Sequence, residues 1–320
     1  MKKILLTNNY TSGPYEIVQS VVPEGFELIM LGTNVMENVI NDVDYILASG
    51  RTKITREVLE KAQKLKMIQR TGVGLDSLDL CAIKDQKIPL YVNQGINAES
   101  VAEHTLLLML ACLRRLTVIH QNTKNGIWKK QEQGVHTFEL RHKKIGLVGM
   151  GNISRTLVGL LKPFEVELYY FDPYRLPTSE EERLGIYFCT FEELIRKVDI
   201  LSLHCPLTNE TKNMVNENVF QEMKEGSILV NTARGGLVDI KSLEKALISE
   251  KISFAGLDVF PEEPLVAGEG ITELDNVILT PHIGGVTRDS FQDMMRSAMR
   301  NIAAFEEGRL SEIEDFRYKV

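Results

Sequence analysis

One short segment near the middle of the chain limits the possible folds more than any other. Residues 143–154, KKIGLVGMGNIS, predict an apolar strand that ends in Gly149 and Gly151 and leads directly into a helix. Gly149 allows a sharp turn, and Gly151 lets the backbone approach a pyrophosphate closely, because neither residue carries a Cβ. The free N–H groups of Asn152 and Ile153 would then meet the anion at the positive end of the helix dipole.

An acidic residue completes this dinucleotide-binding pattern. Asp172 follows the next apolar strand, 166–171, and lies 21 residues beyond Gly151 (172 − 151). This spacing suits hydrogen bonds to an adenosine ribose, and the negative charge would repel a 2′-phosphate, so NAD is expected rather than NADP. Arg175 is the residue that would favour NADP. Ser154 replaces the third glycine of the pattern, and we expect its hydroxyl to face the phosphates. The competing interpretation is an ordinary strand–turn–helix without a ligand.

Composition restricts the remaining possibilities. The 320 residues are enough for two domains, and a net charge of −7 argues against a nucleic-acid or anionic-membrane partner. The longest apolar run, 105–113, is too short to span a bilayer. No signal peptide is expected, because Met1 leads within a few residues into a strand; the expected location is cytoplasmic. The four cysteines show no metal-ligand or C-x-x-C spacing, so reduced thiols and no metal site are expected.

Short apolar strands alternate with helical segments twice along the chain, which predicts two parallel, doubly wound α/β sheets. Six strands are expected in the second sheet, with the glycine-rich segment on the first of them. A helix near 99–120 should lead into the second domain. A helix over 288–307 should return to the first, and the tail beyond it is expected at the surface. The expected domains are therefore 1–97 with 288–320, and 98–287.

Three later segments place polar groups just after predicted strands, where open α/β sheets bind ligands. Arg234, followed by two glycines, suits a bidentate grip on a carboxylate, although a surface ion pair is the simpler alternative. His282 follows a buried strand and suits proton transfer near neutral pH. From spacing alone, either Glu262 or Glu263 can be its carboxylate partner. A nicotinamide, a carboxylate clamp and a carboxylate–histidine pair together predict reduction of a 2-oxoacid.

Several motifs in the same order resemble those of the D-isomer-specific 2-hydroxyacid dehydrogenases, the family that includes 3-phosphoglycerate dehydrogenase and glyoxylate/hydroxypyruvate reductase. The resemblance covers nearly the whole chain. Besides the dinucleotide-binding segment, the motifs that carry it are RTGVGLD at 70–76, NAESVAEH at 97–104, LHCPLT at 203–208, NTARGGLVD at 231–239, GLDVFPEEP at 256–264 and TPHIGG at 280–285.

The resemblance implies a Rossmann NAD-binding domain inserted in a flavodoxin-like substrate domain. It also implies Arg234 as substrate clamp, His282 as acid/base, and Glu263 as the histidine's partner. The backbone N–H groups of Val73 and Gly74 would bind the substrate carboxylate. The cofactor contacts that it adds are Pro206 and Thr211 near the adenosine, and Thr232, Ala233, Asp258 and Gly284 near the nicotinamide. Members of the family are typically dimers through the cofactor domain, and the substrate cleft lies between two domains that close.

Other functions on the same fold remain as alternatives. One is a dinucleotide-sensing, corepressor-like binding protein, and another is formate oxidation, which needs no proton donor. The sequence leaves open which 2-hydroxyacid is used and whether it is phosphorylated. Arg51, after a strand of the first domain, is a candidate contact for a substrate phosphate, and solvent exposure is the equal alternative. His104 is expected to be a packing or surface residue, and His204 to support the cofactor loop without titrating.

Overall fold

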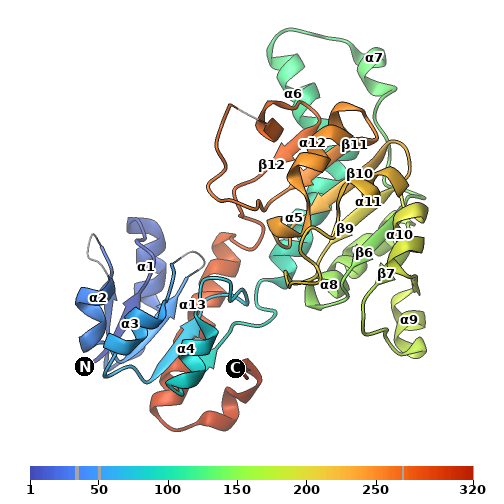
Figure 1. Ribbon diagram of the computed structural model, residues 1–320. Helices are drawn as coiled ribbons and strands as arrows, with labels where there is room; N and C mark the ends of the chain where they lie inside the picture. Colours follow the sequence, from blue (N-terminus) through green and yellow to red (C-terminus); the bar gives the residue numbers. More distant parts are fainter. Residues whose placement is uncertain (33–35, 50–51, 269, 320) are drawn as a thin grey trace. The chain divides into compact units, whose positions relative to one another are not determined.

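The computed structural model describes residues 1–32, 36–49, 52–268 and 270–319, which form two compact units (Figure 1). Unit 1 consists of Met1–Asn97 and Val286–Val320, and unit 2 consists of Ala98–Gly285. Arg51, the candidate phosphate contact, lies outside the described residues. None of the described helices is both long enough and apolar enough to cross a membrane.

Unit 2 is built on a seven-stranded parallel sheet in the order β12-β11-β10-β9-β6-β7-β8. Its strands are β6 (Lys144–Val148), β7 (Glu167–Phe171), β8 (Ile186–Phe188), β9 (Ile200–Leu203), β10 (Ser227–Asn231), β11 (Ile252–Leu257) and β12 (Val277–Leu279). With β6 taken as the first strand, the order is the 3-2-1-4-5-6 arrangement of a dinucleotide-binding sheet, extended by β12. The expectation of six strands is wrong by one, because β8 is an edge strand of three residues and too short to give a pattern.

Helices cover both faces of this sheet, and an apolar core lies on each side. The helices are α5 (Ala98–Leu113), α6 (Leu116–Lys124), α7 (Lys130–Gly134), α8 (Asn152–Leu161), α9 (Thr178–Leu184), α10 (Phe191–Lys197), α11 (Glu217–Glu222) and α12 (Ile240–Ile248). The expected capping box is present, since Thr190 and Glu193 bond reciprocally at the start of α10. Asp239 caps α12 in the same region of the fold.

The single helix expected over 99–120 is in fact two helices. Arg115 adopts a left-handed conformation with φ 48°, which ends α5 and starts α6 in a new direction. Most of α5 is buried against the sheet, whereas no residue of α6 is buried. The chain therefore leaves the core at this point. The periodicity of the segment did not reveal the change, because both helices carry apolar residues.

Unit 1 contains a smaller sheet in the order β13-β5-β4-β3-β1-β2. Its strands are β1 (Lys2–Leu6), β2 (Phe26–Met30), β3 (Tyr45–Ala48), β4 (Met67–Arg70), β5 (Leu90–Tyr91) and β13 (Arg317–Tyr318), and its helices are α1 (Ser12–Ser20), α2 (Met36–Val39), α3 (Arg56–Lys61), α4 (Leu80–Asp85) and α13 (Arg288–Glu306). The first five strands have the flavodoxin-like order 2-1-3-4-5. Among the strands that the structure describes in this sheet, only β13 is antiparallel, beside β5.

The end of the chain belongs to the core of unit 1. Helix α13 packs against α1 and β4, and its Met295 and Ile302 are fully buried. Beyond it, Ile313 is also buried and β13 pairs with β5. The expectation that this tail lies at the surface holds for most of its residues, which are exposed, whereas Ile313 is buried. Because most residues of this segment are charged or polar, its sequence did not indicate that an apolar residue anchors it to the core.

Candidate active site

The glycine-rich turn between β6 and α8 has the geometry that a pyrophosphate site requires. Gly149 has φ +94°, and a Cβ there would lie 2.9 Å from the backbone of His204 and Cys205. A Cβ on Gly151 would meet nothing within 4 Å, so the space beside the N-terminus of α8 is open. An approaching phosphate would find this open space and the free N–H groups of the first helical turn. The turn thus fits a dinucleotide.

Ser154 does not face this open space. Its side chain is fully buried, and its hydroxyl donates a hydrogen bond to the carbonyl oxygen of Gly149 at 2.6 Å. The expectation that this hydroxyl faces the phosphates is therefore wrong. The serine instead ties the first turn of α8 back to the glycine turn.

Asp172 is held in place by two backbone N–H groups. Its Oδ2 accepts from Met150 at 2.8 Å, and its Oδ1 accepts from Tyr174 at 2.8 Å. The carboxylate at the end of β7 is thus fixed against the glycine-rich turn. This position, one strand away from the phosphate site, suits contact with an adenosine ribose.

The loop after β9 is held by a hydrogen bond of its own. The Thr211 hydroxyl donates to the carbonyl of Pro206 at 2.7 Å, which closes the loop on itself. Burial lowers the pKa of His204 to about 4, so this histidine stays neutral at physiological pH, as expected. Burial also raises the pKa of Cys205 to about 11, so its thiol remains protonated and unreactive.

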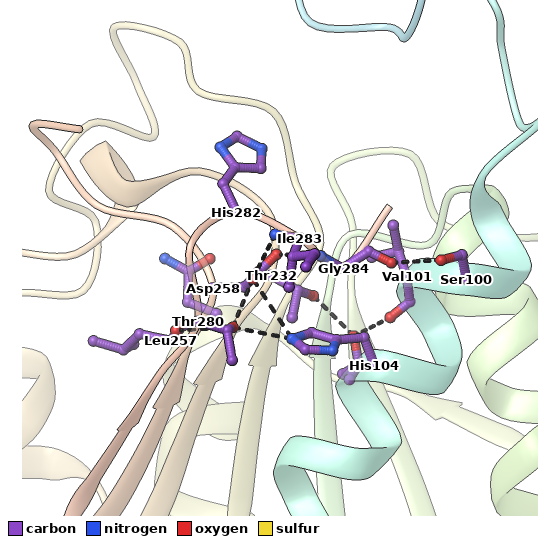
Figure 2. A network of polar contacts seen from close by, with 12 residues as sticks. Ser100, Val101, His104, Thr232, Leu257, Asp258, Thr280, His282, Ile283 and Gly284 are labelled. Atoms are coloured by element: carbon purple, nitrogen blue, oxygen red, sulfur yellow. Dashed lines mark hydrogen bonds and ion pairs between the residues drawn. The ribbon is translucent and has the colours of Figure 1, made fainter. Parts of the chain in front are cut away.

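Asp258, at the end of β11, is the centre of a polar network (Figure 2). Its Oδ1 accepts from the Thr280 hydroxyl at 2.6 Å and from the N–H of Ile283 at 2.9 Å, and its Oδ2 accepts from the N–H of Gly284 at 2.8 Å. Burial alone would raise the pKa of Asp258, but hydrogen bonds from His104, Thr280 and these backbone groups outweigh it and lower the pKa. The buried carboxylate therefore stays ionised and shapes the loop after β12.

Helix α5 supplies polar side chains to this network. His104 Nε2 lies 3.0 Å from Thr280 Oγ1 and 3.5 Å from Asp258 Oδ1. Ser100 donates to the carbonyl of Gly284 at 2.7 Å, and the hydroxyl oxygens of Thr105 and Thr232 lie 2.8 Å apart.

Sequence reasoning missed this role of His104 and Ser100. The available signal was their spacing of four residues, which puts both polar side chains on the same face of α5.

His282 stands on the loop that Asp258 shapes, and it has φ +57°, which is unusual for a residue with a Cβ. Its Nδ1 lies 3.0 Å from Glu263 Oε2 and 3.2 Å from Oε1. Glu263 is also held by the N–H of Phe260, which donates to Oε1 at 3.0 Å. Glu262 is exposed. Of the two carboxylates that spacing allowed, Glu263 is the one in contact with the imidazole, whose ring points away from the Asp258 network (Figure 2).

Arg234 follows β10 on a loop shaped by Asn231, whose side chain donates to the Arg234 carbonyl at 2.9 Å and accepts from the Ala233 N–H at 3.0 Å. The next residue, Gly235, packs directly on the β11 loop. A Cβ on Gly235 would lie 1.9 Å from the carbonyl carbon of Phe260. The loop of Arg234 and the loop of Glu263 are therefore in backbone contact, and the close approach requires glycine.

The two remaining candidates belong to unit 1. Val73 and Gly74 lie on the loop after β4, and the Gly74 carbonyl accepts from Arg70 Nε at 2.5 Å. The Val73 side chain is exposed. A neighbouring arginine thus fixes the backbone of this loop while its side chains remain accessible.

All the unit 2 candidates lie beyond the carboxyl ends of β6, β7, β9, β10, β11 and β12. Parallel strands bring these ends to one edge of a sheet, where such folds bind nucleotides. The edge combines an open glycine-rich turn at a helix N-terminus, an acid fixed beside it and a histidine paired with a carboxylate. Fold and site define a dinucleotide-dependent dehydrogenase.

Comparison with known proteins agrees with this class. Residues 106–284 match the model of the D-isomer specific 2-hydroxyacid dehydrogenase, NAD binding domain. The chain is 36% identical over 276 residues to a glyoxylate reductase of Thermococcus litoralis, which covers 85% of this chain and 83% of the relative. The protein belongs to the D-isomer-specific 2-hydroxyacid dehydrogenase family and is an NAD-dependent enzyme.

Solved structures share the whole fold but differ in substrate. A D-lactate dehydrogenase from Aquifex aeolicus, complexed with NAD and lactic acid, has a TM-score of 0.86 at 27% identity and covers 99% of this chain and 98% of its own. An NAD-dependent formate dehydrogenase from Staphylococcus aureus, in complex with NAD, has a TM-score of 0.84 at 30% identity and covers 96% of each chain. The fold alone therefore does not select the substrate.

The contact between Gly235 and Phe260 gives a direct test of how the site is assembled. We expect Gly235→Ala to lower the free energy of unfolding by about 2 kcal/mol or more, because backbone atoms must move to admit the methyl group. Gly159→Ala is the matched control, since its Cβ would meet nothing within 4 Å on α8 and alanine favours a helix by about 0.5–1 kcal/mol. Denaturant unfolding measures both. Equal stability of the two variants would contradict the close contact.

Proposed function

We propose that the enzyme interconverts a small 2-oxoacid and the corresponding D-2-hydroxyacid with NADH and NAD. The observation that carries this proposal is the 3.0 Å contact between His282 Nδ1 and Glu263 Oε2. A histidine held in this way can give a proton to a carbonyl oxygen during reduction and take it back during oxidation.

The roles follow from the chemistry of each side chain. Arg234 binds the substrate carboxylate through its planar guanidinium and orients the neighbouring carbonyl. NADH, when bound, supplies the hydride that the carbonyl carbon accepts. His282 donates a proton from Nε2 to the carbonyl oxygen, because Nδ1 is directed at Glu263. The Glu263 carboxylate stabilises the imidazolium before the transfer and fixes the ring.

The cofactor assignments are supported by the same edge of the sheet. We assign the pyrophosphate to the turn of Gly149, Gly151, Asn152 and Ile153, the ribose to Asp172, the adenosine end to Pro206 and Thr211, and the nicotinamide end to Thr232, Ala233, Asp258 and Gly284. Unit 2 is then the NAD-binding domain and unit 1 the substrate domain, in which the backbone N–H groups of Val73 and Gly74 bind the substrate carboxylate.

Two other functions are less well supported. Formate oxidation has no use for a proton donor, so it leaves the pairing of His282 with Glu263 without a purpose. A corepressor-like sensor would bind the dinucleotide without turnover, and the cofactor site alone is compatible with it.

A panel of 2-oxoacids tests the proposed activity. Glyoxylate, hydroxypyruvate and 3-phosphohydroxypyruvate are mixed with the enzyme and NADH, and the loss of NADH absorbance is followed. We expect turnover with at least one of them. Arg234→Ala should lower kcat/KM at least about a hundredfold, because a charge-assisted bidentate contact is lost. Arg141→Ala, an exposed arginine of the same unit, is the control. Binding of NADH without turnover across the panel would support the sensor instead.

The two adjacent glutamates separate the acid–base role from a general effect of charge. Glu263→Gln should lower kcat about a hundredfold, because the imidazolium loses its charged partner. Glu262→Gln removes the same charge one residue earlier, from an exposed position, and should change kcat less than twofold. Steady-state kinetics on both variants decide between them. A similar loss in both would remove the specific role of Glu263.

We also propose that the enzyme is a homodimer through unit 2. Helices α6 and α7 contain no buried residue, and a groove of about 470 Å³ lies between them. Large apolar side chains are exposed on and beside these helices, namely Leu107, Leu116, Ile127, Trp128, Val135 and Phe138. Such a cluster is unusual on a monomer and typical of a subunit interface.

Light scattering coupled to gel filtration tests this interface. We expect the wild-type enzyme to have the mass of two chains and the double variant Trp128→Ser/Phe138→Ser to shift towards one chain, because two large aromatic contacts are lost. Ile248→Ser, at an exposed position at the end of α12, should leave the mass unchanged. A wild-type protein that stays monomeric at micromolar concentration would contradict the proposal.

A further inference from the structure

Arg175 lies three residues beyond the ribose-binding Asp172, where a free guanidinium could meet a 2′-phosphate. Two of its three nitrogens already donate to a carboxylate. Nε donates to Glu181 Oε1 at 2.9 Å and Nη2 donates to Oε2 at 3.0 Å, so the pair is bidentate. The guanidinium also lies over the Phe188 ring, 4.9 Å from its centroid. The Nε–Nη2 edge and one face of the guanidinium are therefore in use.

Glu181 is the fixed member of this pair. Its side chain is only 9% exposed on α9, whereas that of Arg175 is 56% exposed. The hydroxyl of the buried Tyr170 donates to Glu181 Oε1 at 2.6 Å. Contact with Arg175 and then with Tyr170 lowers the pKa of Glu181, so the carboxylate stays charged. Glu181 holds the arginine, and the exposed arginine would be free to move if the carboxylate were neutral.

A second arginine at this end of the site is held in the same way. Arg155 Nε donates to the carbonyl of Met150 at 3.2 Å, and its guanidinium is paired with Glu180. Met150 is also the residue whose N–H binds Asp172. Two consecutive glutamates of α9 thus engage two arginines near the ribose position.

We propose that Glu181 is a specificity-determining residue that excludes NADP by withholding Arg175 from the 2′-phosphate. In dinucleotide-binding folds, an acid at the ribose position favours NAD and a nearby arginine accommodates the additional phosphate. This chain carries both residues, and Glu181 decides between them. The preference for NAD therefore has two parts: repulsion by Asp172 and capture of the arginine. This role of Glu181 rests on the proposed assignment of the ribose to Asp172 and does not depend on which substrate is used.

Equilibrium binding tests this without any substrate. Purified enzyme is titrated with NADH and with NADPH, and the fluorescence of the bound dinucleotide gives Kd. In an Asp172→Asn background, which removes the repulsion, adding Glu181→Gln should tighten NADPH binding about tenfold, the value of one charge-assisted hydrogen bond. The Kd for NADH should change less than threefold, which also shows that the variant is folded. Adding Arg175→Ala to this double variant should abolish the gain.

Glu182→Gln is the matched control in the same background. Glu182 is the exposed next residue of α9 and makes no ion pair among the described residues. A similar gain from Glu182→Gln would overturn the proposal, because it would show a general effect of charge. No gain from Glu181→Gln, or a gain that persists without Arg175, would also overturn it.

A further variant covers the case in which Glu181→Gln does not fold. In the Asp172→Asn background, Arg175→Ala alone should leave NADPH binding unchanged, because the captured arginine makes no contact with the phosphate. Weaker NADPH binding in that variant would show that Arg175 already reaches the phosphate, and the proposal would fail.

Discussion

The rest of the site depends on the hydrogen bonds that surround the buried carboxylate of Asp258. A charged group away from water is stable only when donors surround it. Here the donors come from Thr280 and from the N–H groups of Ile283 and Gly284, so the loop after β12 must wrap around the carboxylate. This wrapping places His282 at positive φ, with its ring directed towards Glu263. One electrostatic requirement therefore determines where the imidazole of His282 lies.

A second constraint is purely steric. Gly235 brings the loop after β10 against the backbone of Phe260, and the N–H of Phe260 in turn binds Glu263. Arg234 and Glu263 thus belong to loops that cannot shift independently. The electrostatic contact at Asp258 and the steric contact at Gly235 together connect three consecutive strand ends into one rigid edge. Preorganisation of this kind is what positions a substrate against reacting groups.

The sequence predicted the features that rest on local patterns. The turn at Gly149, the acid at Asp172 and the alternation of strands with helices follow from glycine spacing and apolar periodicity. It did not predict contacts that depend on tertiary packing. The hydroxyl of Ser154, for example, donates to the carbonyl of Gly149 and is buried. The spacing of Ser100 and His104 marks one face of α5, but it does not reveal that His104 contacts Thr280, a residue 176 positions away.

The three side chains to which we assign the chemistry all belong to the unit that binds the dinucleotide, whereas Val73 and Gly74 belong to the other. Under this assignment, replacement of loops in unit 1 can alter which acid is accepted while the histidine and its carboxylate keep their spacing. Residues of unit 2 then determine reactivity, and residues of unit 1 contribute to substrate selectivity. In such a family, substitutions in one unit can change the substrate while the residues that transfer the proton stay the same.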